Sequence, residues 1–213
     1  MAQHEGAGYA QHFSQAGIAC FVVTYRLGTQ GFRHPAMLED ALAAIATVRA
    51  RAADWNLEPD RIGVMGSSAG GHLAAHALTA WDQVKSDVWL RPDFGVLCYP
   101  VISAQGPYAH RGSAANLLGD HPTSAQRDEI SCEKQVTQDT PPCFLWHTGE
   151  DQGVPMENSM AFAWALREHK VPFELHLYAH GGHGLGLNAS FPWADDCVRW
   201  ITELGLAQSS ASR

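Results

Sequence analysis

The segment Gly66-Ser67-Ser68-Ala69-Gly70 matches the pattern G-x-S-x-G, which can carry nucleophilic chemistry. It follows an apolar run and begins a helical run of small residues, the strand–turn–helix setting of a nucleophile elbow. The turn would place the Ser68 hydroxyl at a helix N-terminus, where the dipole favours developing negative charge. We therefore predict that Ser68 is the nucleophile and that the backbone N–H of Ala69 donates to an oxyanion. Ser67, the competing hydroxyl, is expected to point elsewhere.

A serine nucleophile needs an acid that orients its base, and this acid is expected after a strand that follows the nucleophile. The apolar run 143–147 leads into Glu150 and Asp151. Asp151 is the better choice, because the phrase D-x-x-V-P places it just ahead of the next helix.

The base is expected to be a neutral imidazole located after the last strand. There are 12 histidines, so position along the chain must select among them. The run 173–179 leads into His180 and His183. Glycines on both sides of His183 suit a flexible loop that carries the imidazole towards the serine, so we predict His183 as the base and His180 as the runner-up.

No metal or cofactor is predicted. His72 and His76 stand four apart on a predicted helix, but no third ligand follows in a recognisable metal-binding pattern, and His72 is expected to pack behind the elbow. Phosphate-binding and dinucleotide-binding glycine loops are absent from the sequence.

Strand-like and helix-like patterns alternate along the chain, which predicts a mainly parallel sheet covered by helices on both faces. The expected strands are 18–25, 61–66, 94–99, 143–147 and 173–179, and the expected helices are 35–53, 70–80, 155–169 and 191–204. We expect one domain over 1–213. The loop-rich stretch at about 101–140 interrupts the alternation and is predicted to form a lid or pocket wall.

Composition excludes several classes of protein. The chain has 213 residues and a formal net charge of −8, which argues against a nucleic-acid partner. No apolar run approaches the roughly 20 residues that span a bilayer, and the N-terminus lacks the pattern of a signal peptide. Five scattered cysteines suit reduced thiols. We therefore expect a cytoplasmic protein with no membrane partner.

Several longer phrases resemble the acetyl-esterase and acetylxylan-esterase-like branch of the α/β-hydrolases, beside the hormone-sensitive-lipase-like esterases. These phrases are YRLG at 25–28, HPAMLEDA at 34–41, RIGVMGSSAGGHLA at 61–74, CYPVIS at 98–103, FLWHTGEDQGVPMENSMAFAWAL at 144–166 and HGLGL at 183–187. The resemblance implies a three-layer α/β/α sandwich and a serine carboxylesterase that acts on short acyl esters, often acetyl groups on sugars or xylan-type oligosaccharides. Ser68, Asp151 and His183 match the triad of that family.

The chain departs from that family near its N-terminus. Relatives carry a Gly-rich oxyanion loop ahead of an H-E-G-like segment, whereas here His4-Glu5-Gly6 stands near the start and the loop and the first three strands are absent. The family's third strand would lie between 18–25 and 61–66. Three alternatives follow: these two strands pair directly, another copy in a homo-oligomer fills the gap, or Met1 is not the biological start.

Two rival functions remain open at this point. One is a truncated or degenerate hydrolase with little catalysis, and the other is a small peptidase of the prolyl-oligopeptidase type. The expected partner is a small-molecule ester. Tyr9, Trp81 and Tyr108 are candidates for substrate contact, as is Trp146, although large aromatic side chains are more often core residues.

Overall fold

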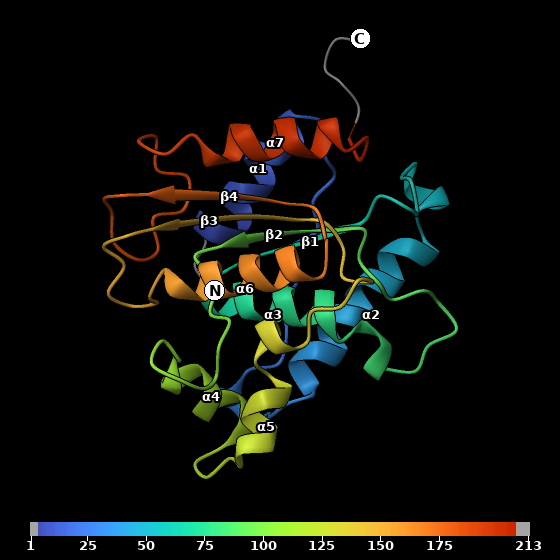
Figure 1. Cartoon of the computed structure of the whole chain (residues 1–213). Helices are drawn as coiled ribbons and strands as arrows, with labels where there is room; N and C mark the ends of the chain where they lie inside the picture. Colours follow the sequence, from blue (N-terminus) through green and yellow to red (C-terminus); the bar gives the residue numbers. More distant parts are fainter. Residues whose placement is uncertain (1–3, 208–213) are drawn as a thin grey trace.

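The strands of the protein form one parallel sheet, which Figure 1 shows in the computed structural model describing residues 4–207. The strands are β1 (Gly63–Ser67), β2 (Phe94–Cys98), β3 (Cys143–Thr148) and β4 (Phe173–Tyr178). They lie in the order β1-β2-β3-β4, and every neighbouring pair is parallel. The carboxyl ends of all four strands therefore meet at one edge of the sheet, where ligands bind in open α/β sheets.

Helices cover both faces of this sheet. They are α1 (Tyr9–Gln15), α2 (Ala36–Ala50), α3 (Ser68–Thr79), α4 (Arg111–Leu118), α5 (Ser124–Glu129), α6 (Glu157–Glu168) and α7 (Trp193–Glu203). Residues of α1 and α7 pack on one face, and residues of α3 and α6 pack on the other (Figure 1). The predicted three-layer α/β/α sandwich is therefore confirmed. None of the described helices is long and apolar enough to cross a membrane.

The two central strands, β2 and β3, are buried along their whole length. Successive side chains of a strand point to opposite faces, so β3 supplies both layers of the core. Phe144 and Trp146 pack towards α7, whereas Leu145 packs towards α3 and α6. This two-sided burial explains why these strands appear in the sequence as continuous apolar runs.

Most elements lie where the sequence predicts them, with ends displaced by a few residues. The helix predicted from Pro35 begins at Ala36, and its buried residues Leu38, Leu42 and Ile45 lie at helical spacing. The difference that matters for the site concerns α3, which begins at Ser68 itself and not at Gly70.

The strand predicted at 18–25 is wrong. These residues carry no strand assignment, and in the described chain β1 pairs only with β2. Phe21 and Val22 are about half exposed, at 48% and 50%. The apolar run has no neighbouring strand to complete a hydrogen-bond ladder, so direct pairing of 18–25 with 61–66 is excluded. The alternatives of a filling copy or an upstream segment stay predictions.

The stretch between β2 and β3 folds into α4 and α5 and is anchored to α6 by one buried amide. Asn158 Oδ1 accepts hydrogen bonds from the backbone N–H groups of Ile102 and Ser103, each at 3.0 Å. Its Nδ2 donates to the carbonyl of Tyr108 at 3.0 Å. These bonds fix both ends of the segment that leaves β2, so the start of the insertion is held rigidly over α6.

The rings of three histidines cluster where the start of α2 meets α3, with His34 stacked on His76 and His72 edge-on to it. The rings of His34 and His76 lie 5.1 Å apart, and those of His72 and His76 lie 5.6 Å apart. His72 Nε2 contacts the carbonyl of Ile130 at 2.8 Å, whereas His76 Nε2 is buried without a hydrogen-bond partner in the described chain. Burial lowers the pKa of His72 and lowers that of His76 well below the ordinary 6.5, so both are neutral in the folded protein at neutral pH.

This burial predicts that stability falls in mild acid. The unfolded chain binds protons on these histidines as the pH drops below 6.5, while the folded chain does not, so the free energy of unfolding decreases below that pH. Each group contributes up to about 1.4 kcal/mol per pH unit. The His76→Leu variant should therefore lose less stability than the wild type between about pH 7.5 and about pH 5.5, as measured by urea unfolding.

The control is His121→Gln, which changes an exposed histidine without a hydrogen bond in the described residues. It should keep the wild-type dependence on pH. An unchanged pH dependence in His76→Leu would show that His76 is not the source.

Candidate active site

The turn between β1 and α3 has the backbone of a nucleophile elbow. Ser68 has a φ of 54°, in the left-handed region that a residue with a side chain rarely occupies. A Cβ added to Gly66 would lie 2.1 Å from the carbonyl oxygen of Gly70, and one added to Gly71 would lie 2.8 Å from Pro100. The turn therefore requires glycine at both positions, and it presents the Ser68 side chain at the carboxyl edge of the sheet.

The structure brings Ser68, His183 and Asp151 into one hydrogen-bonded series. His183 Nε2 lies 2.8 Å from Ser68 Oγ, and His183 Nδ1 lies 2.7 Å from Asp151 Oδ2. A carboxylate can only accept, so Nδ1 carries the proton and Nε2 accepts the hydroxyl hydrogen of Ser68. These contacts orient the imidazole as a general base for the serine.

The Asp151 carboxylate is held by four donors. Its side chain is fully buried, and it accepts from the backbone N–H groups of Gly153 and Val154 at 2.8 Å each. His183 and His147 donate to the other oxygen. Burial raises the pKa of Asp151, but the hydrogen bonds from His183, Val154 and Gly153 outweigh it, so the pKa lies below the ordinary 3.8. Asp151 therefore stays ionised at neutral pH.

His147 is a site residue to which the sequence analysis gave no role. It is fully buried, with Nε2 at 3.2 Å from Asp151 Oδ2 and 2.9 Å from the carbonyl of Val154. Its Nδ1 lies 2.8 Å from Ser159 Oγ. Burial lowers the pKa of His147, so it is a neutral imidazole that donates through Nε2. Only its position at the end of β3, four residues before Asp151, could have indicated this contact.

The two runner-up residues contact each other at the surface. Glu150 Oε1 lies 3.1 Å from His180 Nδ1, and Glu150 also accepts from the backbone N–H of Gly181 at 3.0 Å. The side chains are 59% and 87% exposed, respectively. Within residues 4–207, neither side chain forms a hydrogen bond or ion pair with Ser68 or His183. The geometry therefore favours Asp151 and His183 over this exposed pair.

The side chain of Ser67 points beneath the elbow into a network of hydroxyl groups. Ser67 Oγ and Tyr9 Oη are 3.0 Å apart, and Tyr9 Oη is 3.2 Å from Tyr99 Oη. Tyr99 donates to Glu5 at 2.5 Å, and its ring lies edge-on to the His183 ring at 5.2 Å. Ser67 thus points away from His183, as predicted. The network ties the N-terminal segment to the loop that carries the base.

The residues suggested for substrate contact are scattered. Tyr9 is 4% exposed in the core beside Trp193, and Trp146 is fully buried. Trp81 follows the far end of α3, roughly 18 Å along the helix from Ser68. Tyr108 is exposed on the insertion. Tyr9 and Trp146 are core residues, which sequence position alone did not reveal, and substrate contact by Trp81 and Tyr108 stays a prediction.

A small cavity of about 200 Å³ borders the elbow. Ala69, the second residue of α3, lines it together with the apolar Met37, Leu38 and Leu73 and with polar side chains such as Asn116. The backbone N–H of Ala69 belongs to the first turn of the helix and has no acceptor within it. The cavity could therefore take a small apolar group beside a free N–H donor.

The arrangement contains the groups that acyl transfer needs. Within residues 4–207, no group of three or more His, Cys, Asp or Glu side chains is placed to hold a metal ion. A base-activated serine at a helix N-terminus, next to a free N–H, is the combination that attacks a carbonyl and stabilises the resulting oxyanion.

Comparison with known proteins gives consistent matches. A family model described as alpha/beta hydrolase fold matches residues 2–187. Endo-1,4-beta-xylanase B of Butyrivibrio fibrisolvens is 40% identical over 85% of this chain and 30% of its own length. Acetylxylan esterase of Xylanibacter ruminicola is 31% identical over 99% of this chain and 44% of its own length. The chain therefore spans less than half of either relative.

A solved structure matches more completely. The acetyl ester-xyloside bifunctional hydrolase from Caldicellulosiruptor lactoaceticus is 45% identical, with a TM-score of 0.91. The match covers 97% of this chain and 79% of that one. The arrangement of elements described above is therefore similar to that of a solved enzyme over nearly the whole chain.

The contacts at Asp151 predict how the reactivity of Ser68 responds to substitution. Asp151→Asn keeps the shape but removes the acceptor that fixes the His183 tautomer, a change that costs about 10⁴-fold in kcat in other triad enzymes. Labelling of Ser68 by a fluorophosphonate probe should therefore slow by at least about a hundredfold. The rate is followed by gel fluorescence over time.

The matched control is Glu150→Gln, which alters the neighbouring carboxylate that pairs with His180. Its labelling rate should stay within about twofold of the wild type, because exposed ion pairs contribute little. Equal slowing in both variants would contradict the choice of Asp151.

Proposed function

The chain belongs to the α/β-hydrolase family, and from this membership and the site geometry we propose that it is a serine carboxylesterase acting on short acyl esters. The observation that carries the proposal is the series Ser68–His183–Asp151, with contacts of 2.8 and 2.7 Å at a strained elbow. Its chemistry is that of a serine made nucleophilic by a base whose tautomer is fixed.

The first half of the proposed reaction forms an acyl-enzyme. His183 Nε2 takes the Ser68 proton while Oγ attacks the ester carbonyl carbon. Asp151, still ionised, stabilises the imidazolium that forms. The N–H of Ala69 donates to the developing oxyanion, whose collapse breaks the bond to the alcohol oxygen. His183 then returns its proton to that oxygen, and the alcohol leaves.

The second half repeats these roles with water. His183 takes a proton from water, the resulting hydroxide attacks the acyl carbon on Ser68 Oγ, and the oxyanion again forms beside Ala69. Collapse breaks the bond to Oγ, which receives the proton from His183. The carboxylic acid is released and the enzyme is restored.

The size and lining of the cavity beside Ala69 support a short acyl group. About 200 Å³ is small for a ligand pocket, and its walls are mainly apolar. The relatives named acetylxylan esterase and acetyl ester-xyloside hydrolase support acetyl as the acyl group and a sugar as the alcohol. We therefore propose acetylated sugars, including xylan-type oligosaccharides, as the substrate class.

The proposal predicts that the wild type hydrolyses p-nitrophenyl acetate and releases acetate from acetylated xylo-oligosaccharides. Ser68→Ala should reduce both activities by at least about a thousandfold, because it removes the hydroxyl that His183 Nε2 contacts at 2.8 Å. Release of p-nitrophenol is followed by absorbance, and release of acetate by an enzyme-coupled assay.

Proline p-nitroanilide and p-nitrophenyl octanoate test the rival substrates. Faster cleavage of the proline amide than of the acetyl ester would favour a peptidase. Negligible cleavage of every ester by the folded wild type would favour a degenerate hydrolase and overturn the proposal.

A further inference from the structure

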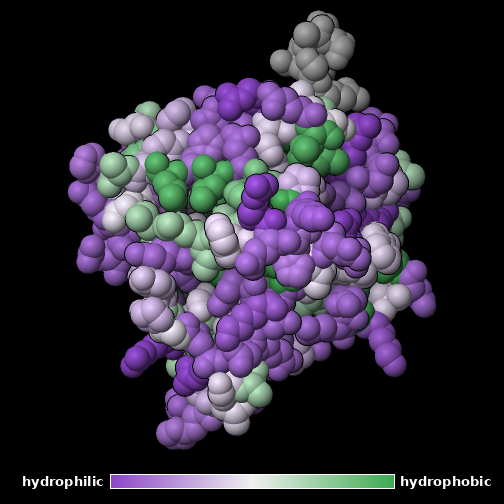
Figure 2. All heavy atoms as spheres, viewed as in Figure 1, coloured by the Kyte–Doolittle hydropathy of each residue, from purple (hydrophilic) through white to green (hydrophobic). Residues whose placement is uncertain are grey.

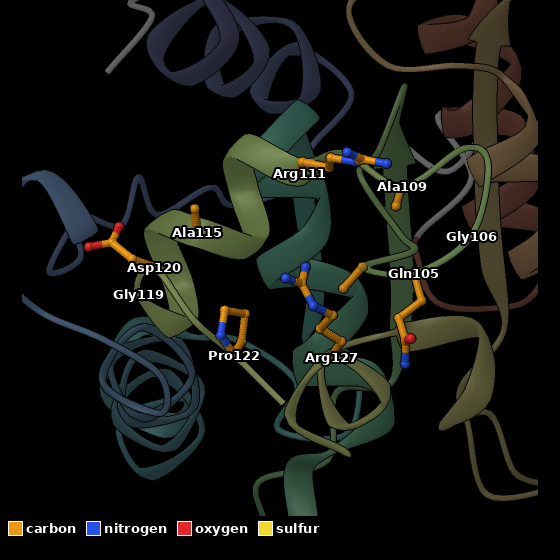
Figure 3. A pocket seen from close by; sticks show the side chains of 10 residues that line it. Gln105, Gly106, Ala109, Arg111, Ala115, Gly119, Asp120, Pro122 and Arg127 are labelled. Atoms are coloured by element: carbon orange, nitrogen blue, oxygen red, sulfur yellow. The ribbon is translucent and has the colours of Figure 1, made fainter. Parts of the chain in front are cut away.

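The insertion between β2 and β3 contains a cavity of its own. It has a volume of about 420 Å³ and lies between α4, α5 and the loop 104–109 (Figure 3). Its charged lining residues are Arg111, Asp120 and Arg127. The surface formed by this insertion, in the lower part of Figure 2, is mainly hydrophilic. A polar ligand suits such a cavity better than an apolar one.

Arg127 is the central side chain of this cavity. It is partly buried on α5, and Figure 3 shows its guanidinium pointing into the space between Gln105 and Pro122. Within residues 4–207, its guanidinium makes no hydrogen bond or ion pair. Arg26, Arg49 and Arg199, in contrast, each pair with a carboxylate. The donors of this partly exposed guanidinium are therefore free to bind an acceptor that enters the recess.

The carboxylates near Arg127 contact other side chains or point away from it. Asp128 contacts Lys134 and accepts a hydrogen bond from Gln105 at 2.6 Å. Glu129 lies 3.6 Å from His34. Figure 3 shows the carboxylate of Asp120 directed away from Arg127. No neighbouring acidic side chain therefore neutralises the guanidinium from within the described chain.

The lining of the cavity carries an excess of positive charge, whereas the chain as a whole is acidic. The chain as a whole has a formal net charge of −8, yet the cavity lining has two arginines and one aspartate. Arg111 lies on the rim beside Ala109, away from Arg127 (Figure 3). A local excess of positive charge in an acidic protein attracts anions and disfavours cations.

We propose that this cavity binds a carboxylate group carried by the substrate, with Arg127 as its main contact. The planar fork of an arginine matches the two oxygens of a carboxylate. A volume of about 420 Å³ lies within the usual range of ligand pockets. Under the proposed function, which this inference extends, the ligand is an acidic sugar residue of an acetylated oligosaccharide.

The position of the cavity fits a second contact on the same substrate. The backbone N–H of Val101 donates to the carbonyl of Ser68 at 3.0 Å, so the insertion starts at the nucleophile. Ala104, which lines the cavity, follows three residues later and is therefore at most about 11 Å from Val101. An oligosaccharide longer than a single sugar can reach both places.

Titration calorimetry with D-glucuronate as the probe tests the proposal. The wild type should bind glucuronate and should not bind D-glucose, which has the same ring without the carboxylate. Arg127→Gln should weaken glucuronate binding by about tenfold or more, because it removes a charge-assisted pair of hydrogen bonds. Arg127→Lys should fall between the two, because it keeps the charge at the end of α5 and loses the fork.

Arg167→Gln is the matched control, since it removes an exposed arginine of α6 outside the cavity. It should bind glucuronate as the wild type does. Equal binding by wild type and Arg127→Gln, or no glucuronate binding by the wild type, would overturn the proposal.

Titration with inorganic phosphate distinguishes a free anion from a carboxylate carried by the substrate. If phosphate alone binds through Arg127, the cavity takes a free anion and the assignment to substrate is wrong.

Kinetics distinguish this proposal from the proposed function. Arg127→Gln should hydrolyse p-nitrophenyl acetate at the wild-type rate, because Arg127 does not touch the reacting atoms. Its KM should rise only for acetylated oligosaccharides that carry an acidic sugar, with kcat unchanged. A wild type inactive on p-nitrophenyl acetate would defeat the proposed function, whereas the glucuronate titration would still decide the role of the cavity.

Discussion

The buried carboxylate of Asp151 is the constraint on which the arrangement of the site depends. A charge without solvent is costly unless donors surround it, and here two backbone N–H groups and two imidazoles do so. The donors come from the turn after β3, from β3 itself through His147, and from the loop after β4. By satisfying one anion, these segments fix the position and tautomer of His183, which in turn faces Ser68.

The sheet supplies the other half of that arrangement. Because all four strands are parallel, Ser68 after β1, Asp151 after β3 and His183 after β4 reach the same edge from three separate stretches of chain. The elbow holds Ser68 at a φ of 54°, and the surrounding glycines remove the clashes that a Cβ would create there. The insertion anchored by Asn158 leaves from this same edge, and the backbone N–H of Val101 at its start donates to the carbonyl of Ser68.

Much of this was predictable, because local patterns determine it. The apolar runs of β2 and β3, the G-x-S-x-G turn and the glycines around His183 each indicate their structure within a few residues. The run 18–25 resembles the buried strands equally well, but a strand also needs a partner, and no local pattern reports whether one is present. The contacts of Tyr9 depend on how distant segments pack, so spacing could not reveal them, whereas the position of His147 four residues before Asp151 was the one local signal of its contact.

The central claim is that Ser68 carries the acyl group during turnover. Mass spectrometry of protein quenched in acid soon after mixing with p-nitrophenyl acetate tests it directly. The account predicts a mass increase of one acetyl group, located by proteolysis on the peptide that contains Ser68 and absent from Ser68→Ala. Substrate turnover without any acetylated protein, or acetylation that persists in Ser68→Ala at the wild-type level, would contradict the account.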